Sequence, residues 1–361
     1  MSGGVDSSLC AHLLVEQGYD VTGVYLECWR APGCRSEEDR KDALQIALEL
    51  GIPFKVLDFK QAYKDKVVEY FFREYEAGRT PNPDVLCNKE IKFGLFYDWA
   101  MEHDFDAVAT GHYAAVNRED QTPFLTIPTD QHKDQTYFLY RLHQAQLDHI
   151  VFPLAHLTKP EVRHQAQQRK LLVADKKDSV GICFIGDIDV TQFLKDRLGE
   201  KPGEVVDTQG NVIGKHKGIW FYTIGQRHGF EINKKTVIKL DNGELLEKEN
   251  IPPFYVIGKD ATKNQLVVGF GSETYADQFG VTDLHWINGH RGEELSQNPG
   301  LVVRIRHTGQ LIPCQLNVET HTVTLDEPTK GIAEGQSAVF YTPLKNGSLA
   351  CLGGGVIKVL G

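Results

Sequence analysis

The stretch SGGVDSS, residues 2–8, decides the fold. Its two glycines, Gly3 and Gly4, allow backbone N–H groups to approach an anion closely. A helical pattern with an apolar face begins within the stretch, and a helix N-terminus favours phosphate. A glycine turn with a Ser/Asp helix cap is the simpler alternative interpretation. We therefore take residues 2–8 as a candidate phosphate loop and ask which fold would hold it.

The candidate loop differs from a Walker-type loop, which ends in Gly-Lys followed by Ser or Thr. Residues 2–8 contain no lysine, and the Gly-Lys pairs at 214–215 and 258–259 are not followed by a hydroxyl residue. Such a loop suits pyrophosphate better than a transferred terminal phosphoryl group. We expect Asp6 to hold Mg²⁺ that is shared with the phosphates.

After this loop, short apolar strands alternate with helical patterns up to about residue 115. Strands are predicted at 20–27, 53–59 and 105–112, and helices at 7–18, 36–51 and 66–78. Ser36 is expected to cap the second of these helices and Gly51 to end it. The alternation predicts an α/β fold with a parallel sheet covered on both faces, whose ligands bind beyond the carboxyl ends of the strands.

The second half of the chain has a different pattern. A helix begins near Thr158, where Glu161 completes a capping box. Residues 203–218 and 254–269 each read as a hairpin of two strands. From about residue 280, short strands alternate with Gly, Asn and Pro turns, a pattern typical of a small barrel or sandwich.

The composition limits the classes of function. The chain has 361 residues and a formal charge of −10, which argues against indiscriminate nucleic-acid binding. It has no apolar run long enough to span a bilayer and no signal pattern, so we expect a cytoplasmic protein that does not bind membranes. Basic residues gather at 159–177, 215–217 and 304–307. The simplest interpretation of each group alone is a solvent-exposed charged face.

The seven cysteines are too scattered for a disulfide framework, so thiols are the default. Cys28 and Cys34 lie close together, but no second pair completes a zinc site, and we expect no metal ion held by protein ligands alone.

Two cysteines lie in segments whose composition favours a reactive thiol. In GRTPNPDVLCNKEIKFG, residues 78–94, Cys87 stands in a turn-forming segment just before a helical pattern that starts near Lys89. A helix N-terminus and a lysine both favour a thiolate. Asp84 lies three residues earlier and is a candidate for local proton transfer. Cys183 lies in a second loop of small residues, KKDSVGICFIG. A buried structural thiol is the alternative for each, but neither is predicted on an apolar helix face.

The intact SGGVDSS at a helix start resembles the signature of the PP-loop ATP pyrophosphatases, which split ATP between its α and β phosphates and adenylate a substrate oxygen. The chain then resembles one family nearly end to end, the bacterial tRNA-uridine 2-sulfurtransferases. The motifs that carry the resemblance keep the family's order and are SGGVDSS, GRTPNPDVLCNKEIKF, ATGHY, KDQTYFL, FPL, EVR, KKDS, GICFIG, YTIGQRHG, GQSAVFY and CLGGG.

The resemblance implies the roles of single residues. Those matching ATP-binding positions are Ser2, Gly3, Gly4, Val5, Asp6, Ser7, Ser8, Leu26 and Gly111. Those matching positions that contact the target base or the tRNA are Asn82, Pro83, Asp84, His112, Lys133, Asp134, Gln135, Arg306, His307 and Gln336. Cys87 matches the family's nucleophile and Cys183 its persulfide cysteine.

The resemblance also implies the reaction and its partners. ATP and Mg²⁺ adenylate O2 of the wobble uridine, and sulfur from Cys183 replaces that oxygen, either directly as persulfide or as sulfide that Cys87 liberates. A Cys87–Cys183 disulfide remains and must be reduced. The implied partners are tRNA and a sulfur donor protein, and the implied oligomeric state is a monomer. The implied domains are a PP-loop catalytic domain at 1–195, a central β-rich tRNA-binding domain at 196–270 and a C-terminal β-barrel at 271–361.

The sequence departs from the family in a few places. DIDV follows GICFIG where Glu-Arg is common, Val180 replaces a threonine, and His307 stands where tyrosine is frequent. Family members carry a strand before the loop, and this chain starts at Met1. We expect weaker ATP binding than in a chain extended by that strand. The alternatives are a PP-loop amidotransferase or synthetase that acts on a small molecule, and an RNA-binding module without catalysis.

Overall fold

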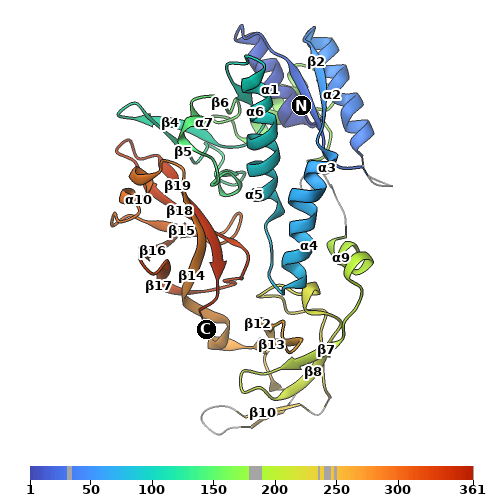
Figure 1. Cartoon of the computed structure of the whole chain (residues 1–361), viewed down its shortest axis with the longest axis vertical. Coiled ribbons are helices and arrows are strands. Elements are labelled where there is room, and N and C mark those ends of the chain that lie inside the picture. Colours follow the sequence, from blue (N-terminus) through green and yellow to red (C-terminus); the bar gives the residue numbers. More distant parts are fainter. Residues whose placement is uncertain (31–34, 179–188, 235, 240–244, 248–249, 361) are drawn as a thin grey trace.

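The computed structural model describes residues 1–30, 35–178, 189–234, 236–239, 245–247 and 250–360. A helical part lies at one end of the molecule, a β-rich part at the other end, and a barrel of strands beside them (Figure 1). Among the helices that the structure describes, none combines the length and the apolar character needed to cross a bilayer.

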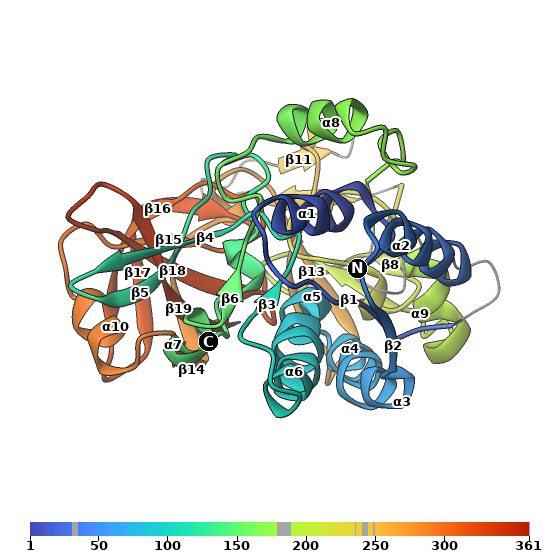
Figure 2. The same cartoon turned by 90° about the horizontal axis from the view of Figure 1, so that it is seen from above.

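The first part is built on two parallel strand pairs. β1 (Gly23–Glu27) pairs with β2 (Phe54–Asp58), and β3 (Val108–Ala109) pairs with β6 (Ile150–Val151). Helices α1 (Val5–Glu16) and α8 (Lys159–Gln168) lie on one side of β1 and β3, and the helices at 60–102 lie on the other (Figure 2). The predicted parallel arrangement is confirmed, although in the described residues the two pairs form separate sheets.

Local sequence explains where several helices begin and end. α2 (Ser36–Leu50) ends at Gly51, which has the left-handed φ of 66°. Its N-cap is Arg35, so the prediction that Ser36 caps the helix was wrong by one residue. α8 begins with the predicted capping box, because the Thr158 N–H donates to Glu161 Oε2 at 2.7 Å.

Two interrupted helices pack against each other below the strands. The first runs through α3 (Lys60–Tyr63), a π-helical turn (Lys64–Val68) and α4 (Glu69–Glu76). The second runs through α5 (Pro83–Cys87), a longer π-helical segment (Asn88–Leu95) and α6 (Phe96–Glu102). Lys66 and Glu90 join the two π-helical segments at 2.6 Å. Such segments are rare and are frequent at functional sites.

The second of these helices corrects one expectation. We expected Cys87 in a turn before a helix, but the helix already begins at Pro83 and contains Cys87. Asn82 caps it, since its side chain accepts from the Val85 N–H at 3.3 Å, and proline is favourable at the first helical position.

Short elements connect this part to the rest. They are the 3₁₀ turn Thr136–Phe138, α7 (Gln144–Leu147), α9 (Val190–Leu198) and the 3₁₀ turn Ile219–Phe221.

The central β-rich part is a five-stranded sheet in the order β12-β13-β7-β8-β9. Its strands are β7 (Gly203–Val206), β8 (Val212–His216), β9 (Glu231–Ile232), β12 (Tyr255–Asp260) and β13 (Gln265–Gly269). Both predicted hairpins are confirmed, because β7 pairs antiparallel with β8 and β12 with β13. A small ladder of β10 (Val237–Lys239) and β11 (Leu245–Glu247) lies beside the sheet.

The C-terminal part is a closed barrel that follows a 3₁₀ turn, Gly271–Thr274. Its six strands run in the order β14-β17-β16-β15-β18-β19, and pairing of β14 with β19 closes the ring. They are β14 (Tyr275–Trp286), β15 (Val302–Arg304), β16 (Ile312–Asn317), β17 (Thr322–Lys330), β18 (Ser337–Pro343) and β19 (Leu349–Lys358). α10 (His290–Leu295) lies between β14 and β15.

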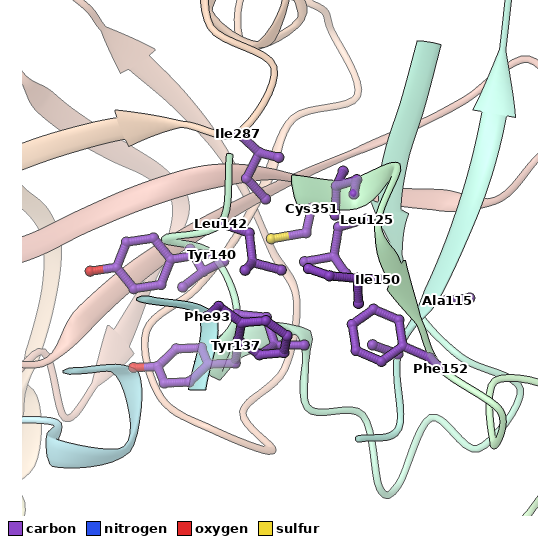
Figure 3. Close-up of a cluster of buried hydrophobic side chains, with 14 of the residues drawn as sticks. Phe93, Ala115, Leu125, Tyr137, Tyr140, Leu142, Ile150, Phe152, Ile287 and Cys351 are labelled. Carbon is purple, nitrogen blue, oxygen red and sulfur yellow. The ribbon is translucent and has the colours of Figure 1, made fainter. Parts of the chain in front are cut away.

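The barrel is attached to the first part by strands and by a shared core. The hairpin β4 (Ala115–Glu119) and β5 (Thr122–Thr126) joins the barrel sheet where Thr126 pairs with Ala350. A buried cluster holds Phe93 and Tyr137 of the first part together with Cys351 of β19 (Figure 3). Aromatic side chains bury large areas, so this cluster fixes the barrel beside the helix that carries Cys87.

Candidate active site

The loop at residues 2–8 opens helix α1 and is held by its own hydroxyls. The Ser2 N–H donates to Ser7 Oγ at 3.0 Å, and Ser8 Oγ donates to the Gly4 carbonyl at 2.8 Å. Gly3 has a φ of 70°, and a Cβ there would lie 2.1 Å from the Asp39 carbonyl oxygen. Only glycine therefore fits at position 3 without displacing α2.

A second glycine keeps the start of α1 open. A Cβ on Gly111 would lie 3.0 Å from the Ser7 backbone nitrogen, so a side chain there would press on the first turn of the helix. The N–H groups of that turn have no partner within the helix, and the helix dipole adds partial positive charge. The loop therefore has the donor set that an anion such as pyrophosphate needs.

Asp6 is the carboxylate of this loop. It accepts a hydrogen bond from the Tyr113 hydroxyl at 3.0 Å, and Lys159 Nζ lies 2.7 and 2.8 Å from its two oxygens. Oδ1 accepts from both groups, whereas Oδ2 accepts only from Lys159 and keeps a further lone pair, so Asp6 fits a magnesium ion that is shared with substrate phosphates. In the described part of the chain, no group of three or more His, Cys, Asp or Glu residues is placed to bind a metal by itself.

Leu26 and Cys28 lie at the carboxyl end of β1, where parallel sheets bind ligands. Leu26 packs against the buried cluster that contains Cys28, Cys87 and the π-helical residue Val67. The predicted nucleotide residue and the predicted nucleophile therefore border one cluster.

Cys87 is completely buried in this structure, with an exposed fraction of 0%. The expectation that Cys87 does not lie on an apolar helix face was wrong, because it belongs to α5 and shares a buried cluster with Ile91, Phe71 and Trp220. Asp84 lies one helical turn before Cys87 in α5, on the same face of the helix. Cys183 lies outside the described residues, as does the Cys87–Cys183 pair implied by the resemblance.

The barrel contributes Gln336 to the segment that precedes Cys87. Gln336 Nε2 donates to the carbonyl oxygens of Thr80 at 3.1 Å and Pro81 at 3.3 Å. The neighbouring Gly335 has a φ of 91°, and a Cβ there would lie 2.9 Å from the Thr80 carbonyl oxygen. Residues 80–84 and 335–336 thus form one surface, although about 250 positions separate them in the sequence.

His112 is buried, and its ring lies beside that of Phe93. Burial, together with the nearby Lys92 ammonium, holds its pKa well below the ordinary histidine value, so the ring is neutral at physiological pH. Nδ1 is 2.9 Å from Thr110 Oγ1, and Nε2 is 3.4 Å from Lys92 Nζ. The lysine must donate, so Nε2 accepts and Nδ1 carries the proton.

Gln135 links the loop to the predicted tRNA residues. Its side-chain oxygen accepts from the Tyr113 N–H at 3.0 Å, and its own N–H donates to the Tyr113 carbonyl at 2.9 Å. Since the Tyr113 hydroxyl donates to Asp6, a short chain of contacts runs from Gln135 to the phosphate loop.

Lys133 and Asp134 take different positions. Lys133 Nζ is 2.9 Å from Asp178, and its side chain is partly exposed. Asp134 is only 1% exposed and pairs with the buried Arg304 at 2.6 Å. Asp134 therefore faces the barrel strand β15 rather than solvent.

Arg306 and His307 follow that strand. Arg306 is exposed, while the His307 ring packs on Phe138 with centroids 4.2 Å apart. Burial lowers the pKa of His307, partly offset by Asp134. Gln336 thus contacts the residue before Asn82, Asp134 pairs with a residue two positions before Arg306, and His307 packs on a residue three positions after Gln135.

Sequence reasoning missed two residues of the site, Lys159 and Asp178. Lys159 Nζ lies 2.9 Å from Asp178 Oδ1 as well as beside Asp6. Although burial opposes it, hydrogen bonds from Lys159 and Lys133 lower the pKa of Asp178 to about 2. The basic segment 159–177 reads as a solvated face in the sequence, whereas Lys159 and Lys176 each bond inward to carboxylates.

Three family models match consecutive parts of this chain. A family model described as a tRNA methyl transferase HUP domain matches residues 1–187. Models described as a tRNA methyl transferase PRC-barrel domain and an aminomethyltransferase beta-barrel domain match 191–270 and 276–357.

Curated relatives carry the name tRNA-specific 2-thiouridylase MnmA. The Pediococcus pentosaceus protein is 42% identical over 369 residues, and the Limosilactobacillus fermentum protein is 43% identical over 378. Each match covers 99% of this chain and 93% of the relative. A solved NMN synthetase from Francisella tularensis is similar over 50% of this chain and 64% of its own, with 19% identity and a TM-score of 0.31, which is too low to bear on the fold.

Proposed function

The chain belongs to the tRNA-specific 2-thiouridylase family, and from this we propose that it catalyses the ATP-dependent 2-thiolation of the wobble uridine in tRNA anticodons. The observation that carries the proposal is the contact chain from Asp6 through Tyr113 to Gln135, which joins a pyrophosphate-type loop to the residues expected to meet tRNA. A reaction that activates an RNA base with ATP needs these two sites side by side.

The first step activates the base. O2 of the uridine attacks the α-phosphorus of ATP, the bond to pyrophosphate breaks, and the base is left as an adenylate. Gly3, Gly4 and the first N–H groups of α1 would stabilise the departing charge. We assign Mg²⁺ to Asp6 and the phosphates; when bound, the ion neutralises charge on the leaving group. The remaining predicted ATP contacts are Ser2, Val5, Ser7, Ser8, Leu26 and Gly111.

The second step transfers sulfur. The terminal sulfur of a persulfide on Cys183 forms a bond to C2, and the C2–O bond to AMP breaks. Cys87 then attacks the inner sulfur, which releases 2-thiouridine and leaves a Cys87–Cys183 disulfide; alternatively, Cys87 first liberates sulfide, which attacks C2. In both routes the two cysteines lose the electrons that the transferred sulfur gains, and a thiol reductant restores them.

Cys87 must become accessible for this step, because its side chain is buried. It is the last residue of α5, which Asn82 caps, and the π-helical segment begins at the next residue, Asn88. Helices bend at π-helical segments, so α5 can shift relative to α6 without the whole helix unwinding. Asp84, one turn away, is our choice for moving the proton.

The tRNA would bind across the surface shared by the first part and the barrel. Arg306 and Lys133 supply exposed or partly exposed positive charge, and Asn82, Pro83 and Asp84 would face the target base. Gln336, His112, Asp134 and Gln135 hold these groups in place, since each makes internal contacts. His307 would offer a ring edge beside Phe138.

We also propose that the chain works as three domains, at 1–195, 196–270 and 271–361. The central domain contributes to tRNA binding. We infer that the protein acts as a monomer in the cytoplasm and receives sulfur from a donor protein. A cysteine desulfurase and a sulfur-relay carrier are both compatible with the chemistry of Cys183.

One incubation tests the proposal. The protein is mixed with tRNA, ATP, Mg²⁺ and a sulfur source, and both the nucleosides and pyrophosphate are measured by mass spectrometry. We expect 2-thiouridine and pyrophosphate, each dependent on tRNA. A methylated uridine in place of 2-thiouridine would instead favour the activity named in the domain models, and finding neither product would overturn the proposal.

A further inference from the structure

The phosphate loop lacks a lysine of its own, yet a lysine ammonium lies directly at it. Lys159 is the first residue of α8, whose capping box and whose proline at position 160 start the helix at this point. The Lys159 backbone N–H also donates to Asp130 Oδ2 at 2.8 Å, which fixes the position of the backbone that carries the side chain. α8 packs on α1 through Val162 and Leu9, so the lysine and the loop keep a fixed relation.

The ammonium of Lys159 has three donors, and all three are used. Two lie 2.7 and 2.8 Å from the Asp6 oxygens, and the third lies 2.9 Å from Asp178 Oδ1. The side chain is only 13% exposed. Lysine in such a position is a strong contact for an oxyanion, because little water competes for it.

The two carboxylates around Lys159 have other hydrogen-bond or ion-pair partners as well. Asp178 also pairs with Lys133 and Arg163, and Asp6 also accepts from Tyr113. A phosphate oxygen can therefore take one of the Asp6 positions while Asp178 keeps the ammonium in place. Asp6 would then be free to turn to the metal ion.

Another lysine near the loop, Lys176, is already paired with other groups of the protein. Lys176 Nζ donates to the Gly3 carbonyl at 2.8 Å and pairs with Asp39 and Asp42. Neither of those carboxylates has a second cation partner in the part of the chain that the structure describes. Moving Lys176 to a phosphate would leave two partly buried carboxylates without their cation, which is costly.

We propose that Lys159, supplied by α8, is the cation that contacts the β and γ phosphates of ATP and so replaces the lysine that the loop lacks. The proposal rests on the function proposed above and names a further binding residue of that site. Lys159 stabilises pyrophosphate both in the bound nucleotide and as it departs.

The test compares ATP with AMP, without tRNA or a sulfur source. Lys159→Gln should weaken ATP binding roughly tenfold to a hundredfold, the effect of losing a charge-assisted hydrogen bond, and change AMP binding by less than about twofold. Calorimetry measures both constants. Lys177→Gln is the matched control, because Lys177 is exposed, near the same site, and loses the same charge. Equal loss of ATP and AMP binding, or no loss of either, would overturn the proposal.

The unaltered protein gives a second reading that does not depend on the variant's folding. An ATP derivative with an acyl group on its γ phosphate acylates a lysine near the phosphates, as the amine attacks the acyl carbon and ATP leaves. Peptide mass spectrometry should find the acyl group on Lys159, and acylation of Lys176 or Lys133 without Lys159 would contradict the proposal. Lysine-dependent ATP binding without tRNA thiolation would reject only the proposed function, and thiolation with unchanged ATP binding in Lys159→Gln would reject only this inference.

Discussion

Gln336 in the C-terminal barrel donates a hydrogen bond to the carbonyl of Thr80, 3.1 Å away, and thereby ties the barrel to the segment that leads into Cys87. The Thr80 N–H donates a second hydrogen bond between the two segments, to the Glu334 carbonyl oxygen at 2.8 Å. A barrel residue thus positions residues 80–84, in addition to any contact that it makes with RNA.

We predict that Gln336→Ala lowers the rate of tRNA thiolation by up to about tenfold, because the segment before Cys87 loses a hydrogen bond of about 1 kcal/mol that orients it. The measurement is single-turnover thiolation at saturating tRNA. Gln315→Ala, an exposed glutamine on β16, is the control and should leave the rate unchanged. If both variants behave alike, the contact with Thr80 does not position the segment.

Cys183→Ser is expected to abolish thiolation while leaving tRNA affinity within about twofold, because serine cannot carry a persulfide but is close to cysteine in size. Gel-shift binding and nucleoside analysis separate the two properties. Cys351→Ser is the comparison, since Cys351 lies in the core shared with the barrel and has no assigned chemistry. Normal sulfur transfer by Cys183→Ser would exclude the persulfide role.

Arg306→Glu should weaken tRNA binding roughly tenfold and reduce the salt slope by about one, because a cation that neutralises a phosphate releases a counterion. Arg306 is exposed next to His307, at the predicted RNA surface. Affinity is measured across a series of salt concentrations, with Lys55→Glu on β2 as a control of equal charge change. An unchanged slope would count against a phosphate contact.

The sequence was sufficient for local structure. The apolar pattern and turn residues located β1, β2 and both central hairpins, and Gly51 marked the end of α2. The helix start at Asn82 and Pro83 also has a local signal, an N-cap followed by proline at the first position, which we read as a turn.

Contacts distant in sequence could not be predicted in this way. Lys159 and Asp6 are 153 positions apart, and only the packing of α8 on α1 shows that their side chains meet. The same holds for the buried pair of Asp134 and Arg304, which in the sequence are part of a motif expected to contact tRNA and one member of a basic group. Composition places such groups on the surface by default, whereas the fold buries them as a pair.

Lys259 of β12 gives a prediction about pH. Its ammonium is buried and finds no hydrogen-bond partner among the described residues, and burial lowers its pKa to about 8 from the usual 10.5. Below pH 8 the folded protein must hold an ammonium that the unfolded chain hydrates freely, so the cost is complete at pH 7. It shrinks as the pH rises from 8 to 10.5, where only the unfolded chain still binds the proton.

Lys259→Met should therefore stabilise the protein at pH 7 by up to roughly 3 kcal/mol, and the gain should disappear above pH 10.5. Urea unfolding of both proteins across this pH range measures the difference. Lys263→Met, an exposed neighbour, should show no such trend. A gain that does not depend on pH would mean that packing, rather than the buried charge, causes it.

In the proposed reaction, O2 of the wobble uridine is adenylated and then replaced by sulfur. The direct test uses tRNA whose wobble uridine carries a heavy oxygen isotope at O2, incubated with the protein, ATP, Mg²⁺ and a sulfur source. We predict that the heavy isotope appears in AMP in step with the formation of 2-thiouridine. Unlabelled AMP, or heavy oxygen released into water, would contradict the account.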